Sequence, residues 1–270
     1  MKFINWLLLF TPACACATEY EPWFTPPFEF QGRMGYRYEH SNSVQSPLGS
    51  FTKPTRDSSV HLALAVTPWP NWHVEAELFL THTSDIDFAY EAAWLTVRYA
   101  WLDDIAGDCL SFVTGATFSF PPESFLHEFS FPYHGHANAE FHATCGKEWS
   151  HGPEWHARLW GLAGYGVAEK GSPWIHGIGV AEYHLAPCAL LGVFTEALYG
   201  FGNTDIVPYV PFTGYASIGH QSIDLGGYLD YEIRCWGTLK VVGWYRVYAH
   251  NYTENNWGTS LTFLVPFSVI

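Results

Sequence analysis

Residues 28–40 read Phe-Glu-Phe-Gln-Gly-Arg-Met-Gly-Tyr-Arg-Tyr-Glu-His, and this stretch decides the fold. Up to Tyr38, its even-numbered positions are apolar, aromatic or glycine, whereas most of its odd-numbered positions are charged or polar. Successive side chains of a β-strand point to opposite faces, so one face of this strand is apolar and the other is charged. A soluble β-sandwich would turn the polar face to bulk water. A transmembrane barrel turns its apolar face to lipid and its polar face to the lumen, which is the arrangement that the whole chain favours.

The same alternation recurs almost to the last residue and predicts an all-β, antiparallel, up-and-down transmembrane barrel of about twelve strands. The predicted strands cover residues 28–40, 58–67, 72–83, 89–101, 109–119, 136–147, 154–166, 174–185, 188–200, 222–235, 238–250 and 257–270. Residues 41–57, 120–135 and 201–221 are predicted loops. An even strand number places both ends of the barrel in the periplasm, with short turns there and long loops outside.

Composition excludes two other classes of protein. Of the 270 residues, 48% are hydrophobic and 18% aromatic, but only 14% are charged. After the N-terminus, no uncharged apolar run approaches the roughly 20 residues of a membrane-spanning helix. The formal net charge of -14 argues against a nucleic-acid partner, which requires a basic surface.

Residues 1–17 are predicted to be a secretory signal peptide. Lys2 supplies the positive start, residues 3–10 are mainly apolar, and Ala13, Ala15 and Ala17 supply small residues for cleavage, which we place after Ala17. An N-terminal strand, or a lipoprotein signal at one of the two early cysteines, is the weaker alternative. Residues 18–27 form a predicted periplasmic lead-in, and residues 28–270 form the barrel.

Two further features accompany the alternation. Trp72, Trp101, Trp155 and Trp236 all fall at predicted periplasmic strand ends, where aromatic girdles lie at the membrane boundary. Near the C-terminus, residues 256–263 carry a polar-x-Gly-x-x-apolar-x-apolar pattern, although the final residue is Ile270. With its signal, the chain resembles porin-like Gram-negative outer-membrane β-barrel proteins. That resemblance implies a bacterial outer-membrane location, with outer-membrane lipid and the barrel assembly machinery as partners.

Charged and imidazole side chains on the alternate set are predicted to face the lumen. They are Glu29, Arg33, Arg37, His73, Glu75, Glu77, Arg98, Glu140, His142, His156, Arg158, Glu182, His184, Asp230, Glu232, Arg234 and Arg246. Several histidines stand two residues from a glutamate and so share its face. Such pairs fit a polar network filling a narrow barrel, a lumen whose charge responds to pH, or a divalent metal site. The first interpretation is favoured, and no metal or other cofactor is predicted.

Catalytic patterns are weak. His134 lies in a predicted loop and His136 at the boundary of that loop with the next strand, which gives a metal no fixed scaffold, and no nucleophile-elbow, phosphate-loop or zinc-helix motif is present. Some outer-membrane barrels are lipid hydrolases with a histidine and a serine two residues apart. Here His40 and Ser41 are adjacent, so a strand would point them to opposite faces, out of the hydrogen-bond reach that a nucleophile and its base need.

Four cysteines follow the signal: Cys109, Cys145, Cys188 and Cys235. All four are predicted at the periplasmic rim, as two pairs on neighbouring strands. Because the periplasm is oxidising, we expect either two internal disulfides or disulfide links to other envelope proteins, with inert thiols as the remaining alternative. Within each pair the alternation points the two side chains to opposite faces, which favours neither alternative over the other.

The leading functional prediction is a narrow solute or ion channel, or a structural envelope protein, with a polar His/Glu/Asp/Arg lumen and no enzymatic activity. A barrel-type lipid-modifying hydrolase and a soluble secreted β-protein are the alternatives.

Overall fold

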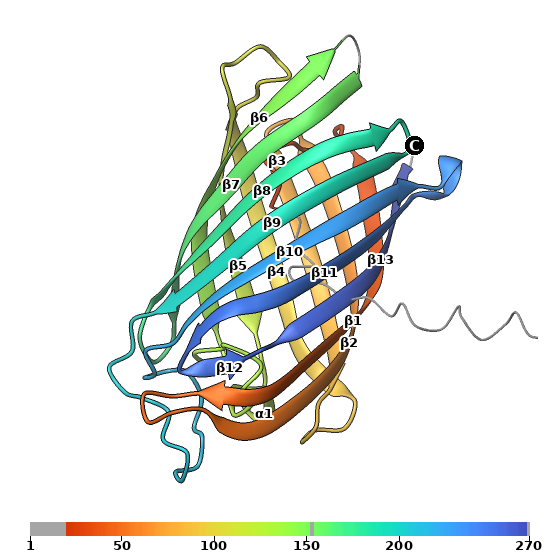
Figure 1. Cartoon of the computed structure of the whole chain (residues 1–270). Helices are drawn as coiled ribbons and strands as arrows, with labels where there is room; N and C mark the ends of the chain where they lie inside the picture. The colour runs from red at the N-terminus through yellow and green to blue at the C-terminus, as the bar shows by residue number, and fades with distance from the viewer. Residues whose placement is uncertain (1–19, 152–153, 269–270) are drawn as a thin grey trace, which may run out of the picture.

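The protein is a closed antiparallel β-barrel (Figure 1). It is described from a computed structural model that covers residues 20–151 and 154–268, so the predicted signal peptide lies outside the described residues. The wall closes because β1 (Glu29–Gln45) pairs with β2 (Phe51–Trp69) along one edge and with β13 (Trp257–Ser268) along the other. The other strands are β3 (Trp72–His82), β4 (Ala89–Leu102), β5 (Ser111–Phe120), β6 (Asn138–His151), β7 (Glu154–Ala168), β8 (Trp174–Ala186), β9 (Ala189–Gly200), β10 (Gln221–Glu232), β11 (Thr238–His250) and β12 (Tyr252–Glu254).

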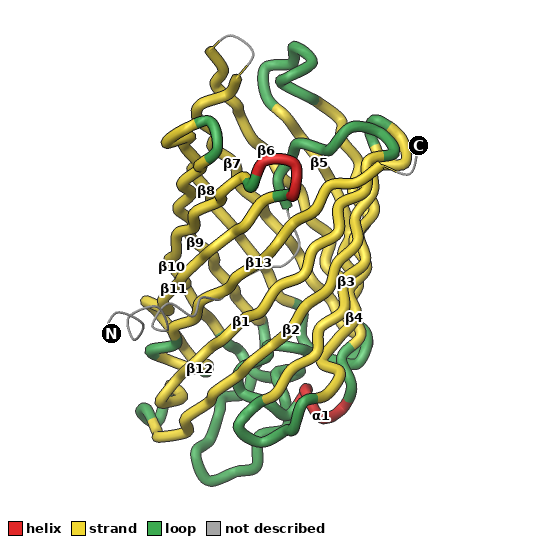
Figure 2. Tube along the Cα trace, turned by 90° about the vertical axis from the view of Figure 1, so that its right-hand side faces the viewer, coloured by secondary structure: helices red, strands yellow, loops and turns green. Residues whose placement is uncertain are grey.

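The barrel wall has the predicted twelve strands, which confirms the fold class. The sheet contains thirteen segments, but β12 is three residues long and pairs only with the tip of β1, beyond the wall. The strands tilt across the barrel, and the longest loops gather with the short helix α1 (Glu123–Leu126) at one end (Figure 2). We call this end the extracellular mouth and the opposite end, where β1 begins and β13 ends, the periplasmic end.

One predicted loop is a strand hairpin instead. Residues 41–57 carry Ser, Asn, Pro and Gly, but β1 and β2 continue through most of this range and project beyond the mouth. Their pairing persists to Val44 opposite Phe51, after one register shift near Ser43. Val44 is fully buried against residues of the β9–β10 loop, so tertiary contact holds a segment whose composition is typical of a turn.

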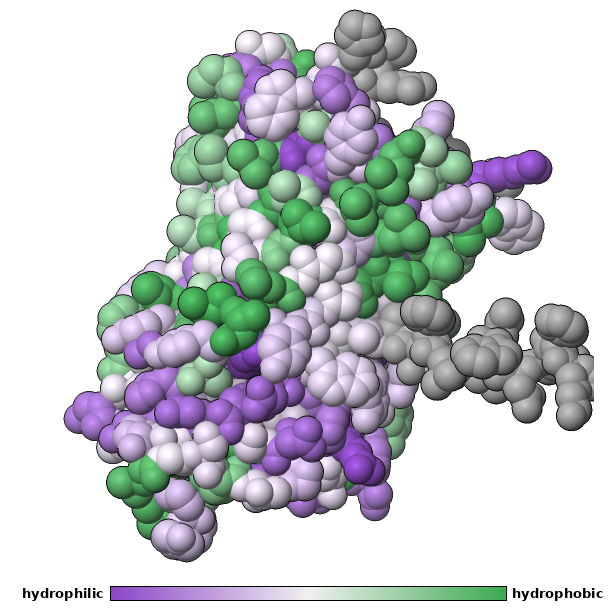
Figure 3. All heavy atoms as spheres, in the orientation of Figure 1, coloured by the Kyte–Doolittle hydropathy of each residue, from purple (hydrophilic) through white to green (hydrophobic). Residues whose placement is uncertain are grey.

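The outer surface of the wall is apolar. Leu62, Leu78, Val193 and Leu229 stand on the outward set of their strands, with between 36% and 55% of each residue exposed. Hydrophobic residues cover the middle of the barrel, and hydrophilic residues concentrate toward the mouth (Figure 3). Such an apolar exterior suits contact with lipid. Unpaired backbone groups would be costly in lipid, and closure of the sheet pairs the edges of the wall.

A tryptophan girdle surrounds the periplasmic end. Trp69, Trp72, Trp101, Trp149 and Trp236 are all exposed there. Trp155 was also predicted in this girdle, but in the structure its side chain turns inward. A register shift between β6 and β7 lets its ring pack 3.9 Å from the Arg158 guanidinium and 4.0 Å from the His184 ring. In the part of the chain that the structure describes, no helix is long and apolar enough to cross a membrane.

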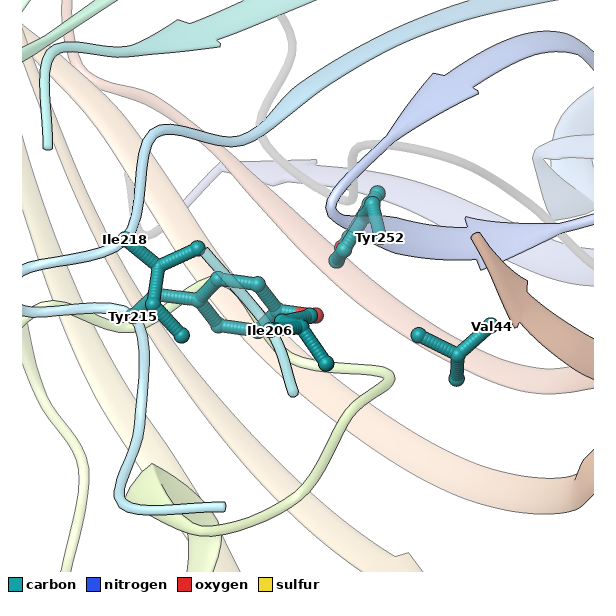
Figure 4. Packing of buried hydrophobic residues seen from close by; sticks show 5 residues of the cluster. All are labelled: Val44, Ile206, Tyr215, Ile218 and Tyr252. Atoms are coloured by element: carbon teal, nitrogen blue, oxygen red, sulfur yellow. The ribbon is translucent and has the colours of Figure 1, made fainter. Parts of the chain in front are cut away.

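Two extracellular loops fold over the mouth. The β9–β10 loop (201–220) contributes Ile206, Tyr215 and Ile218 to a buried cluster with Val44 of β1 and Tyr252 of β12 (Figure 4). The β5–β6 loop (121–137) packs against it: the Phe129 and Phe212 rings stack 4.1 Å apart. Tyr215 also donates a hydrogen bond to the carbonyl of Phe129. These contacts fix the loops over the lumen.

Candidate functional site

Most of the predicted lumen residues lie on the inner face of the wall. Eight of them are buried, namely Arg33, His73, Glu75, Glu77, Arg98, His142, Glu182 and Arg246. Six more are partly buried on the inward set: Glu29, Arg37, Glu140, Arg158, His184 and Asp230. The structure therefore brings together most of a set that is spread over eight strands.

Three members of the predicted set are placed differently. His156 is exposed, because the register shift that turns Trp155 inward leaves His156 unpaired at a bulge. Glu232 and Arg234 are exposed at the periplasmic rim, because β10 ends at Glu232 instead of residue 235. Arg234 there adopts a φ of 45° in a short 3-10 turn, in which the Trp236 N–H donates to the carbonyl of Ile233.

The periplasmic half of the lumen holds a dense polar network. Arg33 forms an ion pair with Glu75, which also lies 3.4 Å from His73 Nε2. Arg158 pairs with Glu148 at 2.8 Å, and the Tyr228 hydroxyl donates to Glu182. Buried charges are tolerated when they are paired. The paired side chains of this network occupy the periplasmic half of the lumen and determine its charge.

The chain itself enters this network. The predicted periplasmic lead-in spans 18–27, but its described residues from Tyr20 to Thr25 lie within the lumen. Phe24 stacks on His73 with ring centroids 5.3 Å apart, and Tyr20 contacts the His142 ring edge-on at 5.1 Å. The Arg98 guanidinium donates to the carbonyl of Glu21 at 2.7 Å. The N-terminal segment Tyr20–Thr25 thus obstructs the periplasmic half of the barrel.

Asp104 anchors this segment from the β4–β5 turn. The indole N–H of Trp23 donates to its carboxylate at 2.8 Å, and the Ser111 hydroxyl and the Glu148 N–H donate at 2.6 and 2.8 Å. Partial burial acts to raise the pKa of Asp104, but these hydrogen bonds together hold it at about 2. The carboxylate therefore stays ionised and keeps its hydrogen bond from Trp23 at neutral pH.

A central cavity lies between the N-terminal segment and the extracellular loops. Its empty space, including the part that opens to solvent, amounts to about 1270 Å³. Tyr20 forms its floor, residues 130–133 of the β5–β6 loop and Tyr252 form its roof, and the inner faces of nine wall strands form its wall. Aromatic rings from Phe79, Trp94, Trp174 and Trp244 alternate there with charged groups. A concave, largely aromatic space with a few polar groups is the usual form of a small-molecule site.

Charged side chains on the cavity wall are bound mainly to one another. Arg246 makes two hydrogen bonds to Asp224, at 2.7 and 2.8 Å, and Arg37 pairs with Glu39. His176 lies between two carboxylates, 3.0 Å from Glu140 and 3.1 Å from Glu196. These bidentate and bridging geometries orient the groups rigidly.

Five of the cavity's charged residues were not among the predicted lumen residues: Glu39, Glu91, His176, Glu196 and Asp224. The alternation could have indicated that Glu39 and Asp224 face the lumen, because they share a face with the predicted Arg37 and Asp230. His176 had no comparable signal, since Gly177 and Gly179 obscure the polarity of its strand.

A histidine pair closes the mouth above the cavity. Nε2 of His134, in the β5–β6 loop, lies 3.0 Å from Nε2 of His220, at the end of the β9–β10 loop. His134 Nδ1 donates to the carbonyl of Ser172 at 2.8 Å, so its Nε2 accepts the proton that His220 donates. This pattern fits two neutral rings, and the buried Nδ1 of His220 has no partner among the described residues.

Burial explains why these rings stay neutral. It lowers the pKa of His134 to about 4, despite the hydrogen bond to Ser172 that acts to raise it. Burial lowers the pKa of His220 to about 3, with smaller contributions from His134 and from the positive charge of Arg246. The pair thus joins three extracellular connections through hydrogen bonds that require uncharged imidazoles.

The other candidate residues are separate from this centre. His40 Nδ1 bonds the carbonyl of Thr55 and the Ser41 hydroxyl donates to the carbonyls of Ser43 and Glu254, so the two do not form a nucleophile–base pair. His127 and His136 lie near the exposed Glu123 on the β5–β6 loop. Among the described residues, no group of three or more metal-ligating side chains is close enough to hold a metal ion.

Three cysteines are exposed and unbridged: Cys109, Cys145 and Cys188. Cys145 pairs in register with Phe112, on the outward set of β6, whereas Cys109 lies in the turn before β5. The side chain of Cys235 lies outside the described part of the structure.

No protein-family model matches the chain, and no curated protein matches it in sequence. Its fold does match solved structures. An outer-membrane channel from Pseudomonas putida F1 superposes with a TM-score of 0.63 at 10% identity, covering 93% of this chain and 99% of that one. The KdgM porin superposes with a TM-score of 0.50 at 9% identity, covering 86% of this chain and 98% of that one.

At these identities the likeness establishes the fold alone. That fold, together with the apolar exterior, defines the class as the β-barrel proteins of the bacterial outer membrane, which is also the location of this protein.

Proposed function

We propose that this protein is an outer-membrane channel for small solutes, narrowed from both ends by its own chain. The observation that carries the proposal is the polar inner face, which runs from the Arg33–Glu75 pair at the periplasmic half to the Arg246–Asp224 pair below the mouth. A purely structural barrel needs no cavity in its centre, and this one keeps a cavity there that is lined by charged and aromatic side chains. The similar solved structures are named as a channel and a porin, which supports the same function.

The path is narrowed at both ends in the described conformation. The N-terminal segment Tyr20–Thr25 obstructs the periplasmic half, and the loops joined by His134 and His220 cover the mouth. Conduction therefore requires one or both to move, so the channel is expected to open intermittently instead of showing a steady, wide conductance. Lid opening of this kind takes about microseconds to seconds.

Planar-bilayer conductance of the refolded protein tests this proposal. Wild-type protein should give small, flickering conductance steps. The double variant Trp23→Ala/Phe24→Ala removes the contacts to Asp104 and His73 that hold the N-terminal segment, and should raise the mean conductance several-fold. Trp101→Ala is the matched control, since this tryptophan lies outside the lumen, 60% exposed in the periplasmic girdle.

Absence of conductance in both the wild type and the double variant would refute the channel and favour a structural envelope barrel. The hydrolase alternative is tested by lipase and deacylase assays on the same preparations. No described contact favours it, since His40 and Ser41 bond to separate backbone carbonyls.

A further inference from the structure

The central cavity carries an imbalance of charge. Its positive groups are Arg37, Arg246 and His176, and its carboxylates are Glu39, Glu91, Glu140, Glu196 and Asp224. Each positive group is already held by a carboxylate of the wall. The cavity therefore has no positive charge to spare for an anion, whereas its carboxylates outnumber its cations.

Among the described residues, Glu91 is the cavity carboxylate that forms no ion pair, although the positive charge of Arg37 acts on it from a longer distance. It is 2% exposed, and the hydrogen bonds that its oxygens accept from described residues come from the hydroxyls of Thr81 and Tyr133, the latter at 2.8 Å. A buried carboxylate held by neutral donors alone is costly, and a cation beside it would relieve that cost.

A β-bulge directs Glu91 into the cavity. In the pairing of β3 with β4, Phe79 stands opposite Ala92 and Leu80 opposite Tyr90, so Glu91 is the extra residue of the bulge. A bulge re-aims one side chain at the expense of a regular ladder, and bulges are frequent beside functional sites. Without this bulge the alternation could not point Glu91 inward while keeping the buried Ala92 in register with Phe79.

Aromatic rings surround the same point. Trp94 follows Glu91 on β4 and packs on Phe79, with ring centroids 5.5 Å apart, and Tyr133 reaches Glu91 from the loop above. A ring face attracts a cation through its quadrupole, most strongly for tryptophan. The combination of rings and a carboxylate without an ion pair is thus suited to a positively charged head on an apolar body.

We propose that the central cavity binds a small organic cation, an amine with an aromatic or other apolar body. The ammonium group pairs with the Glu91 carboxylate, and the body packs against Trp94 and the neighbouring rings. This inference rests on the proposed channel function, because it names the class of solute that the channel would admit. It also predicts that anions such as acidic sugars are poor ligands.

Equilibrium binding to the folded, detergent-solubilised protein tests the inference with three probes of similar shape. Benzylamine carries a positive charge at pH 7, benzyl alcohol is neutral, and benzoate is negative. We expect benzylamine to bind at least about tenfold more tightly than benzyl alcohol, and benzoate to bind least, as measured by calorimetry or tryptophan fluorescence. Equal binding of the three probes, or a preference for benzoate, would overturn it.

Two variants locate the site. Glu91→Gln should weaken benzylamine roughly tenfold or more while leaving benzyl alcohol nearly unchanged. Glu232→Gln is the matched control with the same change in net charge, because Glu232 is exposed at the periplasmic rim. Trp94→Leu should weaken benzylamine as well, and it provides the test if Glu91→Gln does not fold, as judged by heat-modifiable migration on gels. Unchanged affinity for benzylamine in the folded variants would show that the cation does not bind in the cavity.

Binding and conductance separate the two proposals. Charge-selective binding without conductance would support the cation site and refute the channel. Conductance together with equal binding affinity for the three probes would support the channel and refute the cation site.

Discussion

At the scale of single residues, the facing of each side chain has a measurable consequence. Val193 and Leu198 lie on the same strand, but Val193 points outward with 55% exposure and Leu198 lines the acidic cavity. We expect Val193→Arg to lower the free energy of unfolding by about 2–4 kcal/mol, as for arginine near the bilayer midplane. Leu198→Arg should cost less, since carboxylates surround it. Urea titrations in lipid vesicles measure both, and equal losses would show that the facing is wrong.

The sequence predicted the side-chain facing wherever strands pair without interruption. Strict alternation was enough to place Arg33 and Glu75 on the same inner face, where the structure pairs them although they are distant in the chain. It failed for His156 and gave no warning for Glu91, because both lie at bulges that change the parity of a strand. A bulge depends on which partner strand faces it, and this information is absent from a single strand's sequence.

At the scale of structural elements, the His134–His220 pair makes the closed mouth sensitive to acid. Both rings are neutral when closed, with a pKa of about 4 for His134 and about 3 for His220, whereas released loops would expose histidines with a pKa near 6.5. The open state then binds more protons, so the closed state is fully stable above about pH 6.5 and loses stability as the pH falls toward 4. The loss is at most about 1.4 kcal/mol per pH unit for each histidine.

The groups in contact with the pair do not oppose this effect, whereas burial raises the pKa of Asp57 beside the β5–β6 loop and of Glu128 within it and so offsets part of it as the pH falls. Tyr215 and Tyr252 contact His220 at 4.7 and 5.7 Å, and Arg246 adds a positive charge that disfavours protonation of the closed state further. We expect hydrogen exchange in the 121–137 and 201–220 loops, corrected for its intrinsic pH dependence, to accelerate between about pH 6.5 and 4.5 while the strands stay protected. His220→Phe should weaken this pH dependence. Equal corrected exchange at both pH values in the wild type would contradict the prediction.

Elements were predicted well where a period of two repeats, and poorly where tertiary contacts decide. Strands such as β3 and β11 match their predicted bounds to within a residue. The N-terminal segment Tyr20–Thr25 has no periodicity, and only its contacts to residues such as His73, Arg98 and Asp104 hold it inside the lumen. The tip of the β1–β2 hairpin is likewise held by Val44 in a cluster that the folded loops supply.

At the scale of the whole molecule, the closed barrel followed from the even number of strands and the apolar faces, since a sheet in lipid cannot leave an open edge. The central cavity did not follow, because it depends on where the N-terminal segment and two loops stop within the lumen. The sequence predicts that the lumen is polar. It does not predict that Glu91, of all the carboxylates of the cavity, forms no ion pair with a described residue.

The exposed cysteines bear on contacts between molecules. Cys109 and Cys188 lie exposed in periplasmic turns and are unbridged, so they are available to neighbouring envelope proteins in an oxidising compartment. We expect non-reducing gels of whole envelopes to show high-mass species that reductant abolishes, and the variant Cys109→Ser/Cys188→Ser to lose most of them. Cys145→Ser is the control, because Cys145 stands on the outward face of β6 instead of in a turn. A monomer without free thiols would indicate internal disulfides instead, and free alkylation of all four cysteines that follow the predicted signal would contradict both kinds of link.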